Sequence, residues 1–212
     1  MVRKKSNFGL FFGEFLRTYH TTGAIMPSGR YLAAALARYV DPAMPAKRVL
    51  EVGPGTGAVT RRIIKGLGPD DQFDLVELND RFVDRLRHRF ENEPTFQTVA
   101  DRARVLHCPV EDLPAEKNYD VIVSGLPLNN FSVESVQRIL GAFAGLLKPG
   151  GTLSFFEYIA IRKARSLVSN RTERTRLRGI GKALGTLLGP HEIRRDWIWL
   201  NVPPAWVHHV RL

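Results

Sequence analysis

Residues 49–58 have the sequence Val49-Leu50-Glu51-Val52-Gly53-Pro54-Gly55-Thr56-Gly57-Ala58. A strand-like run is followed by three glycines at alternate positions and then by helix-compatible residues, so the segment predicts a strand, a tight turn and a helix. Glycine allows positive φ and lets a ligand approach the main chain, while the new helix presents unpaired N–H groups. The segment therefore predicts a cradle for a nucleotide-like ligand. A turn that only joins strand to helix is the alternative.

The acidic residues near this turn narrow the class of ligand. The spacing G-x-G-x-G differs from the dinucleotide fingerprint G-x-G-x-x-G, and Glu51 at the strand end is unfavourable beside a pyrophosphate. Glu51 suits a cationic ligand better. The run 73–78 predicts a second strand, and a carboxylate at its tip, Glu77, can accept hydrogen bonds from both ribose hydroxyls. Proteins that bind NAD and proteins that bind S-adenosylmethionine share this ribose-binding carboxylate.

A third motif separates these two possibilities. The sequence Leu146-Leu147-Lys148-Pro149-Gly150-Gly151-Thr152-Leu153 predicts a helix stopped by Pro-Gly-Gly before another apolar strand. Together with E-V-G-P-G-T-G at 51–57 and Glu77, it resembles the class I S-adenosylmethionine-dependent methyltransferases. The resemblance implies an α/β fold with a Rossmann-like, seven-stranded, mostly parallel sheet, an antiparallel C-terminal hairpin and N-terminal helices. It also implies S-adenosyl-L-methionine as cofactor and S-adenosyl-L-homocysteine as product.

The same resemblance implies a set of cofactor-binding residues. In methyltransferases of this kind the loop after the third strand covers the adenine, so Glu111 or Asp112 is expected to accept a hydrogen bond from its amino group. A solvated acidic turn is the alternative. The expected cofactor-binding residues are Thr22, Gly23, Glu51, Gly53, Gly55, Thr56, Gly57, Glu77, Leu78, Glu111, Asp112 and Ser124.

The size and composition suit a single α/β domain of 212 residues. The one cysteine, Cys108, cannot form an intramolecular disulfide, fits a reducing compartment and is expected to be a small buried residue. The six histidines have no metal-ligand spacing, so no metal site is expected, and His208 and His209 should point to opposite faces of a terminal strand. No apolar segment reaches the roughly 18 residues of a membrane span.

The net charge of +10 is unevenly distributed. Residues 1–30 carry five basic and one acidic side chain, and residues 159–182 carry eight basic and one acidic side chain. The rest of the chain is almost neutral, so two basic attachments flank a neutral core. This pattern predicts an anionic partner, either nucleic acid or an anionic membrane.

Residues 1–45 are expected to form an amphipathic helix and a lid. An aromatic stripe beside basic residues is typical of an interfacial membrane anchor. A signal peptide, interrupted here by Glu14, and a helix that only caps the core are the alternatives. Ser28 can cap a second helix over 30–39, which is expected to lie over the carboxyl edge of the sheet near the cofactor. The stripe comprises Phe8, Phe11, Phe12, Phe15, Leu16 and Tyr19.

Residues 46–212 are expected to form the cofactor-binding domain, with a basic insert at 159–182. Apolar leucine, valine and isoleucine residues interleave with the arginines of the insert, which favours a helix pair whose basic side meets phosphate. The predicted helices span 81–90 and 132–147. The predicted strands span 49–52, 73–78, 104–108, 119–123 and 152–158, followed by a hairpin of 191–200 and 205–210.

The loop after the fourth predicted strand is expected to hold the methyl acceptor, because it emerges beside the glycine turn. An adenine-N6 methyltransferase would normally have Asn/Asp-Pro-Pro-Tyr or Asn-Leu/Ile-Pro-Tyr here. In this chain Ser124 replaces the amide or acid, and Leu128 replaces the stacking tyrosine. A flipped base then has no obvious hydrogen-bonding and stacking partners, which weakens the RNA hypothesis.

Three further motifs resemble the bacterial phospholipid N-methyltransferases, which convert phosphatidylethanolamine towards phosphatidylcholine. They are T-G-A-I-M-P-S at 22–28, S-G-L-P-L at 124–128 and N-V-P-P-A-W-V at 201–207. The resemblance implies a cytoplasmic enzyme, peripheral on the inner face of the cytoplasmic membrane and bound to anionic phospholipid through the N-terminal helix and the basic insert. A monomer without a nucleic-acid partner is expected. An ornithine-lipid N-methyltransferase, an rRNA adenine N6-dimethyltransferase-like enzyme and a binding-only module are the alternatives.

Direct in-line transfer to the ethanolamine nitrogen is the expected mechanism. Deprotonating a primary alkylamine at pH 7 costs about 4 kcal/mol, so partial desolvation must offset that cost, with the proton leaving through Tyr19 or water. The expected catalytic residues are Tyr19, Ser124, Gly125, Leu126 and Pro127, the last four through main-chain oxygens that orient the amine. Tyr19, Phe131 and Tyr158 are expected to surround the methylated cation, and Arg30 or an insert arginine to hold the lipid phosphate.

Overall fold

The computed structural model describes residues 29–45, 47–159, 171–201 and 203–212. The expected aromatic stripe, Tyr19, Thr22 and Gly23 lie outside the described residues, as does the first half of the basic insert.

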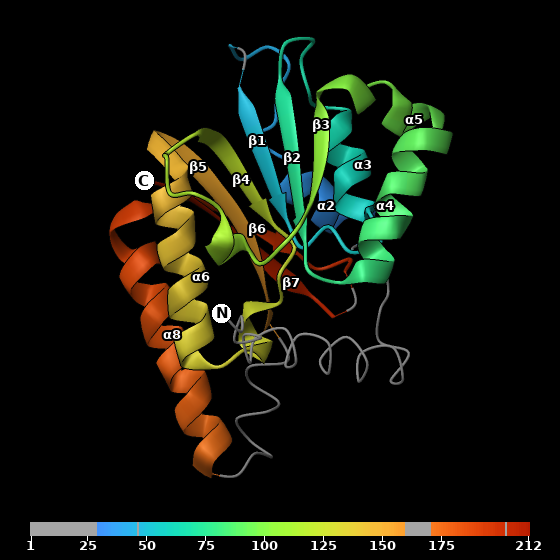
Figure 1. Cartoon of the computed structure of the whole chain (residues 1–212). Helices are drawn as coiled ribbons and strands as arrows, with labels where there is room; N and C mark the ends of the chain where they lie inside the picture. Colours follow the sequence, from blue (N-terminus) through green and yellow to red (C-terminus); the bar gives the residue numbers. More distant parts are fainter. Residues whose placement is uncertain (1–28, 46, 160–170, 202) are drawn as a thin grey trace, which may run out of the picture.

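The described residues form one seven-stranded sheet in the order β3-β2-β1-β4-β5-β7-β6 (Figure 1). The five strands β1 to β5 run parallel, and β7 lies antiparallel between β5 and β6. This confirms the expected mostly parallel sheet with an antiparallel C-terminal hairpin. The strands are β1 (Arg48–Val52), β2 (Gln72–Glu77), β3 (Ala103–His107), β4 (Tyr119–Ser124), β5 (Leu147–Tyr158), β6 (Glu192–Ile198) and β7 (Ala205–Arg211).

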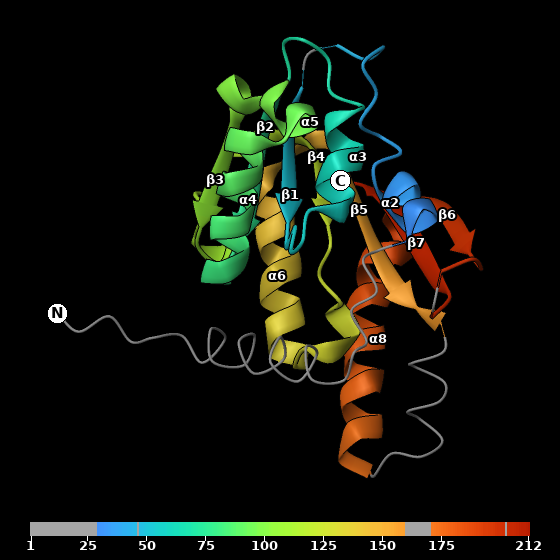
Figure 2. The same ribbon diagram turned by 90° about the vertical axis from the view of Figure 1, so that its right-hand side faces the viewer.

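Helices cover both faces of the sheet (Figures 1 and 2). One face carries α2 (Arg30–Leu36), α3 (Ala58–Ile64), α4 (Asp80–Asn92) and α5 (Pro94–Gln97), and the other carries α6 (Val133–Leu146) and α8 (Arg171–His191). Short 3₁₀ turns occur at η1 (Ala100–Arg102), η2 (Val110–Asp112) and η3 (Leu128–Asn130). The result is the layered arrangement expected of parallel strands that alternate with helices.

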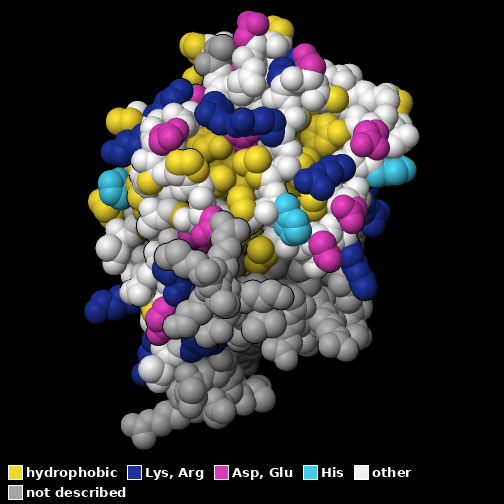
Figure 3. Space-filling view, viewed as in Figure 1, with side chains coloured by type: hydrophobic (Ala, Val, Ile, Leu, Met, Phe, Trp, Pro, Cys, Tyr) yellow, Lys and Arg dark blue, Asp and Glu magenta, His cyan; other side chains and the backbone are white. Residues whose placement is uncertain are grey.

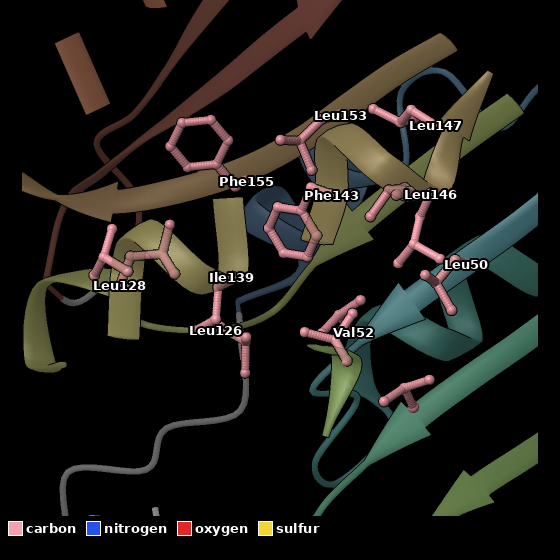
Figure 4. Close-up of a cluster of buried hydrophobic side chains, with 14 of the residues drawn as sticks. Leu50, Val52, Leu126, Leu128, Ile139, Phe143, Leu146, Leu147, Leu153 and Phe155 are labelled. Carbon is pink, nitrogen blue, oxygen red and sulfur yellow. The ribbon is translucent and has the colours of Figure 1, made fainter. Parts of the chain in front are cut away.

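The core consists of two apolar clusters, one on each face of the sheet, because successive strand residues point to opposite faces. Figure 4 shows the cluster on the α6 side, where Phe143 and Ile139 pack against Leu50, Leu153 and Phe155. On the other side, Phe73, Leu75 and Val123 contact the buried faces of α2, α3 and α4. Each fully buried apolar side chain of this size contributes about 1.5–3 kcal/mol.

Local signals set the boundaries of α6 and β5. Ser132 caps α6 as expected, since its Oγ accepts a 3.2 Å hydrogen bond from the N–H of Ser135. Strand β5 begins at Leu147, before the Pro-Gly-Gly turn, whereas the sequence predicted a strand from Thr152. The pairing with β4 shifts register between Tyr119 and Val121, and this irregularity accommodates the turn within the strand.

Helix α2 packs on the sheet, and most of the expected lid, residues 1–28, lies outside the described residues. Leu32 and Leu36 are fully buried, and α2 packs on the face formed by β5, β7 and β6. Its N-terminus is fixed at the carboxyl edge, where the N–H of Gly29 donates a 3.0 Å hydrogen bond to Oδ1 of Asn201.

The described half of the basic insert is one long helix. Helix α8 continues to His191, nine residues beyond the expected end of the insert, and packs on α6 and β7. Leu177, Ile180 and Leu184 form its buried side, and Arg178 and Lys182 are exposed. The segregation of apolar and basic residues follows from the helical period.

Candidate functional site

The glycine turn lies at the carboxyl edge of the sheet, between the ends of two neighbouring strands. Val52 at the end of β1 pairs with Val76 of β2 and with Ser124 of β4. The N–H of Gly53 donates to the carbonyl oxygen of Val76 at 2.9 Å, and the N–H of Gly125 donates to that of Val52 at 2.8 Å. The turn and the acceptor loop that follows β4 are therefore joined through the backbone.

The three glycines of the turn have positive φ, at 69° for Gly53, 55° for Gly55 and 81° for Gly57. Glycine is needed for close approach at Gly53, where a Cβ atom would lie 2.5 Å from a methyl group of Leu126. At Gly55 a Cβ atom would meet nothing within 4 Å, so this residue faces open space. The turn therefore leaves room for a ligand at Gly55.

The Cα of Gly57 packs closely against α4. A Cβ atom there would lie 2.9 Å from the guanidinium of Arg89 and 3.4 Å from Leu86 of α4. Thr56, between the two glycines, is half-buried. Gly53 thus lines the cleft, whereas the Cα of Gly57 faces α4.

Glu77 links the turn to the tip of β2. Its Oε2 accepts a 3.0 Å hydrogen bond from the N–H of Gly55, and its Oε1 accepts bonds of 2.9 Å from the N–H groups of Leu78 and Asn79. Burial raises the pKa of this carboxyl, and these N–H groups offset part of the rise. Each carboxylate oxygen can accept more than one hydrogen bond, so the Oε2 atom retains capacity for a ribose hydroxyl.

Glu51 is fully buried at the end of β1, and neither carboxyl oxygen has a hydrogen-bond partner among the described residues. Burial raises its pKa to about 8; the nearby Thr60 opposes part of the rise, and the neighbouring Glu77 carboxylate adds to it. Two buried carboxyl groups thus lie close together. A cationic ligand would relieve this energetic cost, which agrees with the ligand class predicted from the sequence.

A shallow cleft that is open to solvent lies beside Glu77. Its walls are mainly apolar, as expected for a slot that receives a flat ring. In the space-filling view, apolar side chains gather between α6 and β3 on this face, bordered by lysine and arginine (Figure 3). The lining residues are Val52, Gly53, Val76, Glu77, Leu78, Cys108, Pro109, Val110, Glu111 and Leu126.

Glu111 and Asp112, the two residues expected to accept a hydrogen bond from the adenine amino group, differ in their position relative to the cleft. Glu111 lines it, and its buried Oε2 has no hydrogen-bond partner in the described part of the chain. Burial raises the pKa of Glu111. Asp112 is exposed and does not line the cleft. The structure therefore favours Glu111, and Asp112 corresponds to the solvated alternative.

Contacts with the backbone fix the residues of the acceptor loop in place. Ser124 is fully buried, and its Oγ accepts a 3.3 Å hydrogen bond from the N–H of Leu126. Gly125 is needed for close approach, since a Cβ atom there would lie 2.6 Å from the carbonyl oxygen of Gly53. Leu126 lines the cleft, and Pro127 begins the turn into η3. The expected role of these residues in orienting the acceptor amine stays a prediction.

Phe131 does not have the role expected of it. Only 1% of the side chain is exposed, and the ring belongs to the core cluster shared with Phe143 and Leu128. The expectation that its ring face meets the substrate cation was wrong, because the apolar side chains of α6 and η3 enclose it.

Two other expected substrate residues lie at the carboxyl edge. Tyr158 ends β5 and is half-buried, with its ring edge-on to Phe156 at 5.0 Å. Arg30 begins α2 and is exposed, with its guanidinium 4.7 Å from the ring centroid of Tyr31. Neither residue lines the cleft beside Glu77.

The sequence did not predict that Arg176 would support the acceptor loop. Its guanidinium donates to the carbonyl oxygen of Asn129 at 3.1 Å and also to that of Phe131. Arg176 is one of several arginines on α8, and nothing in its local pattern distinguishes it. The cleft-lining pair Cys108 and Pro109 was also missed, although both residues directly follow β3.

Known proteins that are similar in sequence to this chain include methyltransferases. A family model described as a methyltransferase domain matches residues 49–151. An ornithine lipid N-methyltransferase from Singulisphaera acidiphila is 30% identical over 148 residues, which span 70% of this chain and 76% of that protein. Several other curated relatives are far longer, and the matched regions span only 3–6% of their length.

Solved structures share the fold at low sequence identity. An O-methyltransferase from Bacillus cereus, in complex with SAH, has a TM-score of 0.61 at 14% identity and covers 95% of this chain and 90% of its own. P. horikoshii TYW2, in complex with MeSAdo, has a TM-score of 0.60 at 16% identity and covers 89% of this chain and 65% of its own.

Proposed function

Because the chain belongs to the class I S-adenosylmethionine-dependent methyltransferases, we propose that it methylates the primary amine of a membrane lipid, with phosphatidylethanolamine as the acceptor. S-adenosylmethionine is the cofactor, and when bound it supplies an electrophilic methyl group on a sulfonium. The observation that carries the lipid assignment is the similarity to a lipid N-methyltransferase over most of both chains.

The residues in and next to the cleft fit this cofactor. Glu51 and Glu77 are buried carboxyl groups whose ionised forms a cationic ligand would favour, and Gly55 leaves room beside the main chain. Glu77 can accept hydrogen bonds from ribose hydroxyls, and Glu111 has a buried oxygen available for an adenine amino group. No group of three or more metal-binding side chains occurs among the described residues, and the proposed chemistry requires none.

The acceptor amine is proposed to bind beside Gly125 and Leu126, where main-chain oxygens of the acceptor loop orient it. Holding the amine in an apolar, partly desolvated edge lowers the cost of its neutral form, which is about 4 kcal/mol at pH 7 for an unperturbed alkylamine. Tyr158 and Arg30, at the same edge of the sheet, are proposed contacts of the methylated cation and of the lipid phosphate. Tyr19 is proposed as a route for the proton.

An ornithine lipid is the second candidate acceptor, and the curated relative favours it. It also offers a primary alkylamine, so the same positioning applies. The two acceptors differ in the anionic group near the amine, a phosphate in one and a carboxylate in the other. The preference of the enzyme for one lipid therefore depends on whether it binds the phosphate or the carboxylate.

We further propose that the enzyme acts as a monomer, peripherally on the cytoplasmic face of an anionic membrane. Each basic side chain near such a surface is worth about 1 kcal/mol, so the basic segments at 1–30 and 159–182 could hold it there. No helix in the described ranges is long and apolar enough to cross a bilayer.

The proposal is tested with labelled S-adenosylmethionine and vesicles of phosphatidylglycerol mixed with phosphatidylethanolamine or with ornithine lipid. Thin-layer chromatography separates the methylated products, and structured RNA serves as the competing acceptor. Faster labelling of phosphatidylethanolamine supports the first candidate, and faster labelling of ornithine lipid supports the second. Label in RNA alone, or in no acceptor while the cofactor binds, contradicts the lipid proposal.

A further inference from the structure

The turn between β6 and β7 exposes a cluster of large apolar side chains. Trp199 is 62% exposed, Leu200 74% and the neighbouring Trp197 53%. The ring centroid of Trp197 lies 5.4 Å from those of Trp199 and Trp206, so the rings form a continuous surface. We call these four residues the tryptophan turn. An apolar cluster of this kind marks an interaction surface.

The tryptophan turn is anchored to the core. Asn201, which follows Leu200, is buried, and its Oδ1 accepts a 3.0 Å hydrogen bond from the N–H of Gly29. Its Nδ2 donates a 2.8 Å hydrogen bond to the carbonyl oxygen of Pro203. The side-chain amide therefore ties the turn to the start of α2, and the exposed residues are presented on a rigid base.

The tryptophan turn lies at the same edge of the sheet as the cleft. Strands β5 and β6 are both antiparallel to β7, and therefore run in the same direction (Figure 2). Ala205 pairs with Tyr158 at the end of β5 and with Ile198 at the end of β6. The turn after β6 thus lies at the carboxyl edge, where the glycine turn and the acceptor loop also lie.

A basic surface adjoins the same edge. Helix α8 precedes β6 and therefore begins at the carboxyl edge, and both views show its first half extending beyond the sheet (Figures 1 and 2). Arg174, Arg178 and Lys182 are exposed on this helix. Tryptophan rings favour the interface between lipid head groups and acyl chains, and basic side chains are attracted by anionic lipid.

We propose that the tryptophan turn inserts into the head-group region of an anionic bilayer and directs the carboxyl edge towards it. The juxtaposition with α8 favours a membrane over a second copy of this chain, since two copies would bring two basic helices together. This inference rests on the proposed function, because docking at this edge would bring the lipid amine to the cleft from the membrane side.

Intrinsic fluorescence reports directly on this surface, because the three tryptophans of the chain are Trp197, Trp199 and Trp206. With vesicles of phosphatidylethanolamine and phosphatidylglycerol, the emission should shift to shorter wavelength and be quenched by brominated lipid. Unchanged emission from protein that sediments with the vesicles would show docking through another surface and overturn the inference. A shift that depends on protein concentration without vesicles would show self-association, which also overturns it.

A double variant, Trp199→Ser with Leu200→Ser, should weaken partitioning into vesicles by about tenfold or more, since both side chains would leave the bilayer. Ile193→Ser is the matched control: Ile193 is 41% exposed at the opposite end of β6, and its loss should leave partitioning unchanged. Equal partitioning of the double variant and the wild type would contradict the inference.

The two proposals can fail separately. If the tryptophan turn docks, the double variant should lose more activity on vesicles than on a dispersed short-chain amino lipid. A wild-type protein that shows the spectral shift but methylates no lipid would refute the proposed function and leave the docking surface intact. A wild-type protein that methylates lipid without the spectral shift would support the proposed function and refute docking through the tryptophan turn.

Discussion

The backbone N–H of Gly55 donates a 3.0 Å hydrogen bond to Oε2 of Glu77, so the glycine turn and the tip of β2 form one binding unit. Gly55 faces open space, while Gly53 is tightly packed against Leu126. The space for the cofactor therefore depends on the residue at position 55. This relationship makes Gly55 the most direct point at which to test the cofactor site.

Replacing Gly55 with valine should weaken S-adenosylmethionine binding at least about tenfold. The side chain would project into the open space, and the positive φ of 55° would be strained for a β-branched residue. Isothermal titration calorimetry measures the effect. Gly141→Val on α6 is the control, because Gly141 also faces open space but has no positive φ. Vesicle binding should survive in both variants, and its loss with Gly55→Val would contradict the separation of cofactor and membrane sites.

Cofactor affinity should rise with pH up to about 8 and then level off. Without a cation, Glu51 has a pKa of about 8 and is mostly protonated at pH 7, whereas a cationic ligand binds better to the ionised form. Titrations at several pH values should show this rise in the wild type and a smaller rise in Glu51→Gln. Ionisable groups of the ligand affect the wild type and the variant equally, so the difference between the two pH profiles reports on Glu51. Identical pH profiles would show that the ionisation of Glu51 does not affect the affinity for the ligand.

Arg176→Met should lower methyl transfer to a dispersed amino lipid while leaving cofactor affinity within about twofold. The guanidinium holds the carbonyl oxygens of Asn129 and Phe131, and without it the acceptor loop loses charge-assisted hydrogen bonds worth about 1.5–3 kcal/mol each. Arg178→Met, an exposed arginine on the same helix, is the matched control. A variant that loses cofactor affinity as much as activity would show general destabilisation instead of a displaced loop.

The protein should lose thermal stability as the pH falls from about 6.5 to about 4. His209 is buried against Ser154, Tyr39 and Asp196, with Arg38 and Arg194 nearby, and burial lowers its pKa to about 4. A lowered folded-state pKa means that the neutral ring stabilises the fold above the unfolded pKa, and this contribution is lost as the folded pKa is approached. Scanning calorimetry should show a steeper fall in Tm for the wild type than for His209→Gln. Equal slopes would assign the acid sensitivity to other groups.

Local patterns explain why much of the fold and the position of the glycine turn could be predicted. The positive-φ glycines, the carboxylate that ends β2 and the Ser132 cap each depend on residues close in sequence. Those signals located the turn and Glu77. They could not choose between Glu111 and Asp112, because the direction of each side chain depends on how η2 packs against α6.

Features that depend on distant contacts could not be predicted. Gly29 and Asn201 are 172 residues apart, yet their hydrogen bond ties the start of α2 to the turn between β6 and β7. Arg176 holds a carbonyl oxygen 47 residues away, and Phe131 is buried by helices that no local pattern orients. Tertiary packing decides these positions, and periodicity alone does not specify it.

The central claim, that a lipid amine receives the methyl group, is tested most directly in a bacterial host that makes phosphatidylethanolamine but no phosphatidylcholine. The chain is expressed there, and the extracted lipids are analysed by mass spectrometry. We predict new species that carry one or more added methyl groups on the ethanolamine nitrogen, and their absence from cells that express Gly55→Val. An unchanged lipid profile, from a wild-type protein that is folded and binds S-adenosylmethionine, would contradict the claim.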